Sequence, residues 1–176
     1  MRTLFIGTII MILTSLLTAC ASKPSVPVVE KVELNRFMGK WYVIASIPTM
    51  IEKNIYNATE TYTLNKDGTI DTEFTFRDGS FDGAQKKYNP KGFVRADTNN
   101  AVWGMQFIWP IKAEYVISYL DEDYQQTIIA RSSLDYVWLM ARTPSITEES
   151  YNKQVERIRA MGYDTSKLVK VPQRWE

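Results

Sequence analysis

The stretch Gly39-Lys40-Trp41-Tyr42-Val43-Ile44-Ala45-Ser46-Ile47 decides the fold of this chain. Aromatic and β-branched residues dominate it and Pro48 ends it, which is typical of a β-strand. Similar stretches follow at short, regular spacing, and the hairpin turn Asn65-Lys66-Asp67-Gly68 separates two of them. The pattern predicts roughly eight or nine strands, as in an all-β barrel or sandwich.

Turn residues and prolines mark the ends of the other predicted strands. One such turn is Asn89-Pro90-Lys91-Gly92, and another is Asp97-Thr98-Asn99-Asn100. A short helical turn is expected before the first strand, at residues 34–38. We expect the strands at residues 41–47, 57–64, 69–76, 84–88, 93–96, 102–109, 114–120, 124–131 and 135–142.

One longer helix is predicted after the last of these strands. Thr147 is a suitable N-cap, and Glu148 and Glu149 suit the positive end of the helix dipole. The apolar residues of this segment recur at helical spacing, and they are Tyr151, Val155, Ile158 and Met161. Such a stripe would pack against the outside of the sheet, with Gly162 as the C-terminal cap. A last short strand is expected at residues 168–171.

The N-terminus has the features of a secretory signal. A positively charged start precedes the apolar run from Leu4 to Leu17, which is too short to span a bilayer comfortably. Leu17-Thr18-Ala19-Cys20 resembles a bacterial lipobox, in which cleavage leaves an acylated cysteine as the new N-terminus. We therefore expect a lipoprotein-type signal peptide at residues 1–19, then a lipidated N-terminus and a Pro-rich tether at residues 20–33. The alternative is a plain signal peptide with an unrelated cysteine.

Composition excludes several classes of chemistry. The chain contains no histidine, which removes Ser-His and Cys-His dyads and histidine ligation of zinc or haem. Cys20 is the only cysteine, so its acylation would leave no free thiol and no disulfide. The formal net charge is +1, and removal of residues 1–19 with Arg2 would bring it to 0. This balance does not favour nucleic-acid binding. We predict no metal and no cofactor.

Three motifs occur in the order found in a known family. Gly39-Lys40-Trp41-Tyr42 resembles the Gly-x-Trp signature of the lipocalins, and Arg142 stands where that family packs an arginine on the tryptophan ring. Leu120-Asp121-Glu122-Asp123-Tyr124 departs from the family's usual Thr-Asp motif. Together with Asp135-Tyr136-Val137-Trp138-Leu139-Met140-Ala141-Arg142-Thr143-Pro144, however, it closely resembles the bacterial outer-membrane lipoprotein lipocalins. The resemblance implies an eight-stranded antiparallel up-and-down barrel over residues 34–176, with one C-terminal α-helix packed outside.

Alternation along the strands predicts which side chains face the inside of that barrel. Gly39, Trp41 and Arg142 are expected as the signature at the barrel floor. The residues expected to line a ligand cup are Val43, Ala45, Tyr62, Phe74, Phe76, Trp103, Met105, Phe107, Tyr115, Ile117, Tyr136, Trp138 and Met140. The sequence leaves open whether these side chains line a cavity or fill a solid core.

Glu60 also faces inward by alternation with Tyr62. Because a buried carboxylate needs a partner, however, a place at the mouth or outside is the commoner outcome.

An apolar, aromatic cup suits one long hydrocarbon tail with a polar head group. The resemblance to the lipoprotein lipocalins points the same way, and Ala21 after the cysteine implies sorting to the outer membrane. We therefore expect a non-enzymatic protein, lipid-anchored through Cys20 at the periplasmic face of the outer membrane, that stores or transports fatty acids or lysophospholipids. The alternatives are a lipid-modifying enzyme on the same scaffold and a structural envelope protein with a filled barrel. The sequence also leaves open whether two copies form a homodimer.

Overall fold

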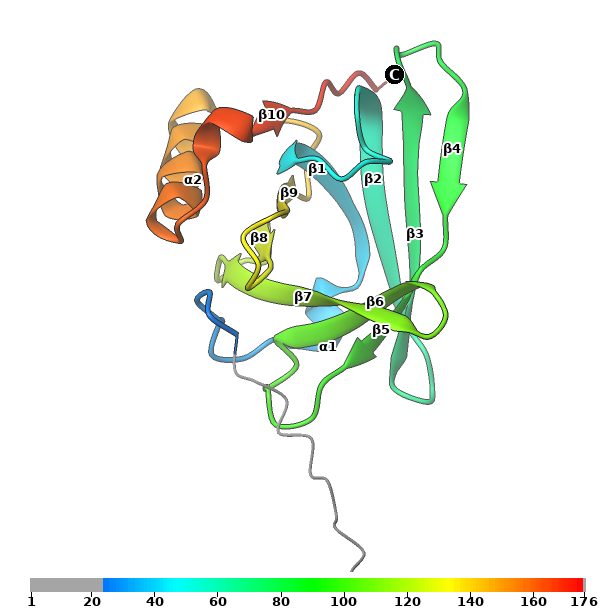
Figure 1. The fold of residues 1–176 in the computed structure, drawn as a ribbon, viewed down its shortest axis with the longest axis vertical. Coiled ribbons are helices and arrows are strands. Elements are labelled where there is room, and N and C mark those ends of the chain that lie inside the picture. The colour runs from blue at the N-terminus through cyan, green and yellow to red at the C-terminus, as the bar shows by residue number, and fades with distance from the viewer. Residues whose placement is uncertain (1–23, 176) are drawn as a thin grey trace, which may run out of the picture.

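The structure is a computed structural model, and it describes residues 24–175. Its strands form one sheet that closes into a barrel, because the last barrel strand pairs with the first (Figure 1). The strands are β1 (Gly39–Ile47), β2 (Ile55–Leu64), β3 (Thr69–Asp78), β4 (Gln85–Tyr88), β5 (Lys91–Val94), β6 (Val102–Ile108), β7 (Ile111–Leu120), β8 (Gln126–Ala130) and β9 (Val137–Ala141). All neighbours in the closed order β1-β2-β3-β5-β6-β7-β8-β9 are antiparallel, so the predicted eight-stranded up-and-down barrel is confirmed.

β4 and β5 are two pieces of one interrupted strand that runs along β3. β4 pairs with residues 74–77 of β3, and β5 pairs with residues 69–71. Pro90 lies between the two pieces and has no backbone N–H, but its carbonyl accepts a hydrogen bond from the backbone N–H of Thr72 at 3.1 Å. The chain therefore continues along β3, and the predicted turn at residues 89–92 is wrong.

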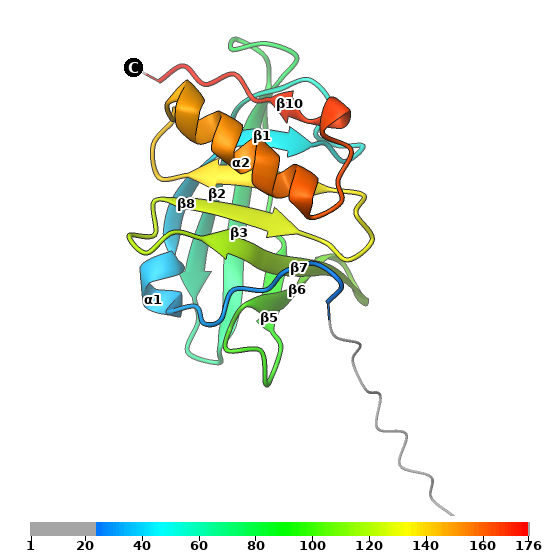
Figure 2. The same cartoon turned by 90° about the vertical axis from the view of Figure 1, so that its left-hand side faces the viewer.

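The helix α2 (Glu148–Ala160) lies across the outside of the barrel, as Figure 2 shows. The Thr147 hydroxyl caps it by accepting a hydrogen bond from the backbone N–H of Ser150 at 3.1 Å. Gly162 follows the end of the helix with a φ of +100°, a conformation that glycine adopts without strain. The predicted helix and both of its caps are confirmed. The elements after it are the 3₁₀ helix η1 (Thr165–Lys167) and the strand β10 (Val169–Lys170), which pairs with β1.

A β-bulge in β1 exchanges its inward and outward residues. The pairing with β9 shifts between Val43, which lies opposite Met140, and Ala45, which lies opposite Leu139. Val43 and Met140 belong to the core inside the barrel, whereas Ala45 and Leu139 belong to the core between the barrel and α2. The extra residue at the bulge reverses the alternation of the strand. Ala45 is therefore buried on the outer side, and the prediction that it lines the cup is wrong.

A helical turn, α1 (Leu34–Phe37), closes one end of the barrel, and the segment between β1 and β2 lies at the other end (Figure 2). The indole N–H of Trp41 donates to the Phe37 carbonyl at 2.8 Å, which ties this turn to β1. Gly39 joins the two with a φ of +92°, and a Cβ at this position would lie 3.5 Å from the Arg142 guanidinium. The structure thus brings Gly39, Trp41 and Arg142 together at the closed end.

The membrane anchor predicted from the sequence falls outside the part of the chain that the structure covers. Cys20 and the predicted signal segment before it lie outside the described residues. The later part of the predicted tether does not hang free: Val26 and Val32 are buried, and the backbone N–H of Val29 donates to the Ile117 carbonyl at 3.1 Å, so the chain packs on the barrel before residue 34. Within residues 24–175, none of the helices is long and apolar enough to cross a membrane. The same residues contain no group of three or more Cys, Asp or Glu side chains arranged to hold a metal ion.

Candidate functional site

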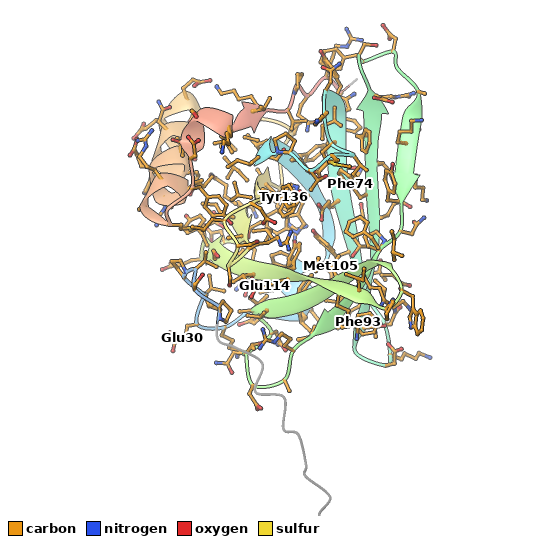
Figure 3. The ribbon with its side chains drawn as sticks, in the orientation of Figure 1. Glu30, Phe74, Phe93, Met105, Glu114 and Tyr136 are labelled. Atoms are coloured by element: carbon orange, nitrogen blue, oxygen red, sulfur yellow. The ribbon has the colours of Figure 1, made fainter. Side chains whose placement is uncertain are left out.

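The barrel contains a cavity of about 380 Å³, which the β1–β2 loop at the end opposite α1 helps to line. This volume is at the lower end of the roughly 300–1,000 Å³ typical of small-ligand pockets, so the cavity suits one slender ligand. Figure 3 labels four of its lining residues, Phe74 on β3, Met105 on β6, Glu114 on β7 and Tyr136 in the β8–β9 loop. The lining residues are Thr49, Met50, Ile51, Glu52, Glu60, Thr72, Phe74, Pro90, Met105, Phe107, Ala113, Glu114, Tyr115, Arg131, Tyr136 and Trp138.

Apart from Ala45, the predicted cup residues fall into two groups. Those that line the cavity are Phe74, Met105, Phe107, Tyr115, Tyr136 and Trp138. Those that are buried in the barrel core without lining the cavity are Val43, Tyr62, Phe76, Trp103, Ile117 and Met140. Alternation could not separate the groups, because both face the inside of the barrel and differ only in their position within it.

The half of the barrel near α1 is solid and aromatic. The Phe37 ring lies with its centroid 5.0 Å from that of Trp41, 5.7 Å from Tyr62 and 5.4 Å from Trp103. Trp103 in turn stacks on Tyr115, with centroids 5.1 Å apart and ring planes 8° apart. Tyr115 is the member of this cluster that lines the cavity, so it marks the level where the solid core ends and the cup begins.

The loop between β1 and β2 supplies part of the wall, and sequence reasoning missed it. Its residues Thr49 to Glu52 line the cavity, although loops carry no alternation from which this could be predicted. Glu52 is buried and accepts two hydrogen bonds at 2.9 Å, from the indole N–H of Trp138 and from the backbone N–H of Thr49. Its carboxyl group thus fastens the loop to the wall of the barrel. Burial raises the pKa of Glu52 above its ordinary value.

Glu60 faces the inside of the barrel and lines the cavity, so the expectation of a place at the mouth or outside is wrong. The Tyr62 hydroxyl donates a hydrogen bond to Glu60 Oε2, and the Tyr62 and Tyr115 hydroxyls are 2.7 Å apart. Burial, opposed by the hydrogen bond from Tyr62 and assisted by the nearby Glu52 carboxyl, raises the pKa of Glu60 to about 7. This cluster places a polar group at the bottom of an otherwise apolar cup.

Two charged residues stand in the cavity wall beyond this cluster. Arg131 pairs with Asp135, with Nη1 3.0 Å from Oδ2, while its Nε is buried without a hydrogen-bond partner among the described residues. Glu114 accepts hydrogen bonds from the backbone N–H of Ser132 at 2.6 Å and from its hydroxyl at 3.1 Å. Arg131 is therefore the cation in the lining of the cup, while Glu114 is occupied with holding the β8–β9 loop.

Large apolar side chains are exposed on the two loops that border the mouth. Met50 and Ile51 belong to the β1–β2 loop, and their exposed fractions are 81% and 43%. The second group lies at the turn between β6 and β7 and consists of Phe107, Ile108, Trp109 and Ile111, of which Trp109 is 83% exposed. These side chains give the border of the mouth an apolar surface.

The closed floor, the apolar cup and the external helix define a barrel that binds small hydrophobic ligands. A family model described as "Lipocalin-like domain" matches residues 32–173, and the chain belongs to the lipocalin family. The lipocalins as a class hold small hydrophobic ligands in such a barrel, and they are generally binding or transport proteins.

The chain is similar to plant and bacterial lipocalins over most of its length. Temperature-induced lipocalin-1 from Arabidopsis thaliana is 36% identical over 163 residues, covering 86% of this chain and 84% of that protein. Outer membrane lipoprotein Blc from Vibrio cholerae is 30% identical over 164 residues, covering 90% and 94% respectively. The Blc lipoprotein of Escherichia coli K12 is 27% identical over 171 residues and covers 90% of each chain.

Solved structures confirm the fold at much lower sequence identity. Insecticyanin from the tobacco hornworm Manduca sexta superposes with a TM-score of 0.66 at 14% identity, over 87% of this chain and 86% of that one. Apocrustacyanin C2 superposes with a TM-score of 0.64 at 15% identity, over 81% and 80%. At these sequence identities the comparison shows a shared fold and says nothing about which ligand this chain binds.

Proposed function

We propose that this lipocalin is a non-enzymatic lipid-binding protein, anchored to the periplasmic face of the outer membrane through acylated Cys20, that stores or transports fatty acids or lysophospholipids. The observation that carries the proposal is the cavity, which is narrow, mostly apolar and closed at one end by the aromatic floor. A single acyl chain has the shape and chemistry that such a cup accommodates. The similarity to the Blc outer membrane lipoproteins supports the location.

The energetics of burial fit a ligand of this class. About twelve methylene groups at about 0.8 kcal/mol each contribute about 10 kcal/mol of gross transfer free energy. Association and ordering oppose this with several to about 15 kcal/mol. The net affinity expected for an acyl chain with a weak polar contact is therefore in the micromolar range or weaker.

The mouth of the cup supports an orientation with the tail inside and the head group outside. Arg131 in the wall offers a positive charge to a carboxylate or phosphate, while the exposed Met50 and Trp109 offer an apolar border. A lipid leaving a membrane would pass from one apolar surface to another without exposing its chain to water.

Fractionation of cells tests the anchor. The full chain should sediment with outer membranes, and Cys20→Ser should release it from them, because acylation needs the thiol. A chain that sediments equally with and without Cys20 would contradict the anchoring.

A lipid titration tests the ligand class and separates it from the enzymatic alternative. Tryptophan fluorescence should change on addition of a fatty acid or a lysophospholipid, because Trp138 lines the cavity. Mass spectrometry of the same mixture should recover the added lipid unchanged. Turnover of the lipid that is lost in Glu60→Gln would instead support a lipid-modifying enzyme, since Glu60 is the buried acid-base group of the cup.

A further inference from the structure

We propose that the cup selects a fatty acid that carries a hydroxyl group near the far end of its chain, with that hydroxyl bound at the base of the cup by Glu60 and Thr72 and the carboxylate held near Arg131. The inference rests on the proposed function and names the substrate class of the same site. Neither polar end of such a ligand would be left without a partner, whereas an unsubstituted chain would place its methyl end against a carboxyl group.

The first observation is the incomplete hydrogen bonding of Glu60. Its carboxyl group lines the cavity, only 9% of the residue is exposed, and Tyr62 is its hydrogen-bond partner among the described residues. A carboxylate can accept hydrogen bonds on both oxygens, and the bond from Tyr62 occupies one of them, Oε2. The base of the cup therefore presents an acceptor to whatever enters it.

The second observation, independent of the first, is Thr72 on the neighbouring strand β3. Its hydroxyl is buried and has no hydrogen-bond partner within residues 24–175, and the residue, 3% exposed, lines the same cavity. Thr72 pairs with Tyr62 across β2 and β3, while Glu60 pairs with the next inward residue, Phe74. Two adjacent strands thus present an acceptor and a hydroxyl to the same part of the cup.

The charges around the base exclude a carboxylate there. The titratable groups that act on Glu60 are Tyr62 on β2, Tyr115 on β7 and Glu52 on the β1–β2 loop, and none of them is a cation. A second carboxylate would meet two carboxyl groups in an apolar cavity, which is repulsive. A hydroxyl instead donates to Glu60 and accepts from Thr72.

The opposite end of the site holds the one cation among the described residues that line the cup, Arg131, beside the carboxylates of Asp135 and Glu114. Arg131 lines the cavity, and its buried Nε has no hydrogen-bond partner within residues 24–175, although Asp135 neutralises one side of the guanidinium. Along β2, Glu60 lies five residues from the strand's first residue, Ile55. At about 3.3 Å per residue and a strand tilt of about 40°, the cup is about 13 Å deep, which suits a medium-length chain with a polar group at each end.

The experiment compares three ligands of equal chain length on the purified, delipidated full chain at pH 8. The ligands are ω-hydroxydodecanoate, dodecanoate and dodecanedioate, and their affinities are measured by tryptophan fluorescence and calorimetry. We expect the hydroxy acid to bind about tenfold tighter than dodecanoate, as one added hydrogen bond to a charged group implies, and the diacid to bind weakest. Equal binding of the hydroxy acid and dodecanoate, or tightest binding of the diacid, would overturn the inference.

Variants locate the effect within the cup. Glu60→Leu and Thr72→Val should each reduce the preference for the hydroxy acid, and Glu60→Leu should tighten dodecanoate binding. Thr75→Val is the matched control, because Thr75 lies on β3 with its hydroxyl bonded to Thr59, and it should leave the preference unchanged. If Glu60→Leu does not fold, Thr72→Val and the three-ligand series still test whether the base of the cup binds a hydroxyl group. A chain that binds neither these three ligands nor a lysophospholipid contradicts the proposed function itself, whereas one that binds all three ligands alike contradicts only this inference.

Discussion

The guanidinium carbon of Arg142 lies 3.8 Å from the ring centroid of Trp41, although the two residues are 101 positions apart in the sequence. The same guanidinium donates hydrogen bonds at 2.8 to 3.0 Å to four carbonyls of the segment before and at the start of β1, those of Arg36, Phe37, Met38 and Lys40. One side chain thus joins the end of β9, the start of β1 and the α1 turn. It closes the floor of the barrel without touching the cavity.

Replacement of this arginine should affect stability and spare binding. Arg142→Ala removes the cation–π contact and leaves several carbonyls without a donor, so we expect a loss of about 3 kcal/mol in the free energy of unfolding. Arg142→Lys keeps the charge but cannot bridge the same carbonyls, so its loss should be intermediate. Chemical denaturation measures the free energy of unfolding of both variants. A variant that loses lipid affinity while keeping full stability would contradict this role.

Trp138 should show the opposite behaviour. It lines the cavity, and its indole N–H binds Glu52, so Trp138→Ala should weaken lipid binding by about tenfold or more while the β-sheet circular dichroism is retained. Trp103→Ala is the matched control, because Trp103 is fully buried in the solid floor and its loss should destabilise the fold by about 3–5 kcal/mol. Unfolding of the Trp138 variant would place that residue in the core instead of the cup.

The buried Glu60 should make stability fall as the pH rises. The unfolded chain releases the proton of this carboxyl near its ordinary pKa of 4.5, whereas the folded chain keeps it until about 7. Between these values the unfolded state holds fewer protons, so the free energy of unfolding decreases by about 3 kcal/mol across this window.

Denaturation at pH 5 and pH 8 checks this dependence in matched variants. Glu60→Gln should remove most of it. Glu52→Gln should remove a smaller part, because burial also raises the pKa of Glu52. A pH dependence unchanged by Glu60→Gln would show that this carboxyl titrates normally.

The cap of the external helix should matter for stability alone. Thr147→Ala removes the hydroxyl that accepts from Ser150, at an expected cost of about 1 kcal/mol. Because α2 packs outside the barrel, the affinity for lipid should stay within about twofold of the unaltered chain. A larger change in affinity would mean that the stability of α2 is coupled to lipid binding in the cup.

The strands, the helix and the closure of the barrel could be predicted because each leaves a local or periodic signal. Gly39-Lys40-Trp41-Tyr42 fixed the first strand, and Thr147 and Gly162 fixed the ends of the helix. The β-bulge at Ala45 leaves no such signal, since an inserted residue only exchanges the two faces of the strand, and the residues from Val43 to Ile47 are all apolar or small. Pro90 was misread for a related reason, because a proline interrupts a strand as readily as it ends one.

The candidate site could be predicted only in part. Alternation found Phe74, Tyr115 and Trp138, but it could not tell the hollow half of the barrel from the filled half, which depends on how the rings of Phe37 and Trp103 pack. It placed Glu60 inward, and the ordinary cost of burying a carboxylate argued against that position. The hydrogen bond from Tyr62 offsets part of this cost, and burial raises the pKa of Glu60 to about 7.

Native mass spectrometry of the full chain, purified from membranes and incubated with dodecanoate or a lysophospholipid, tests the central claim most directly. We predict one single-chain lipid per barrel, with occupancy reduced in Trp138→Ala and retained in Thr147→Ala. A chain that carries no lipid after purification and takes up neither ligand on incubation would contradict the account.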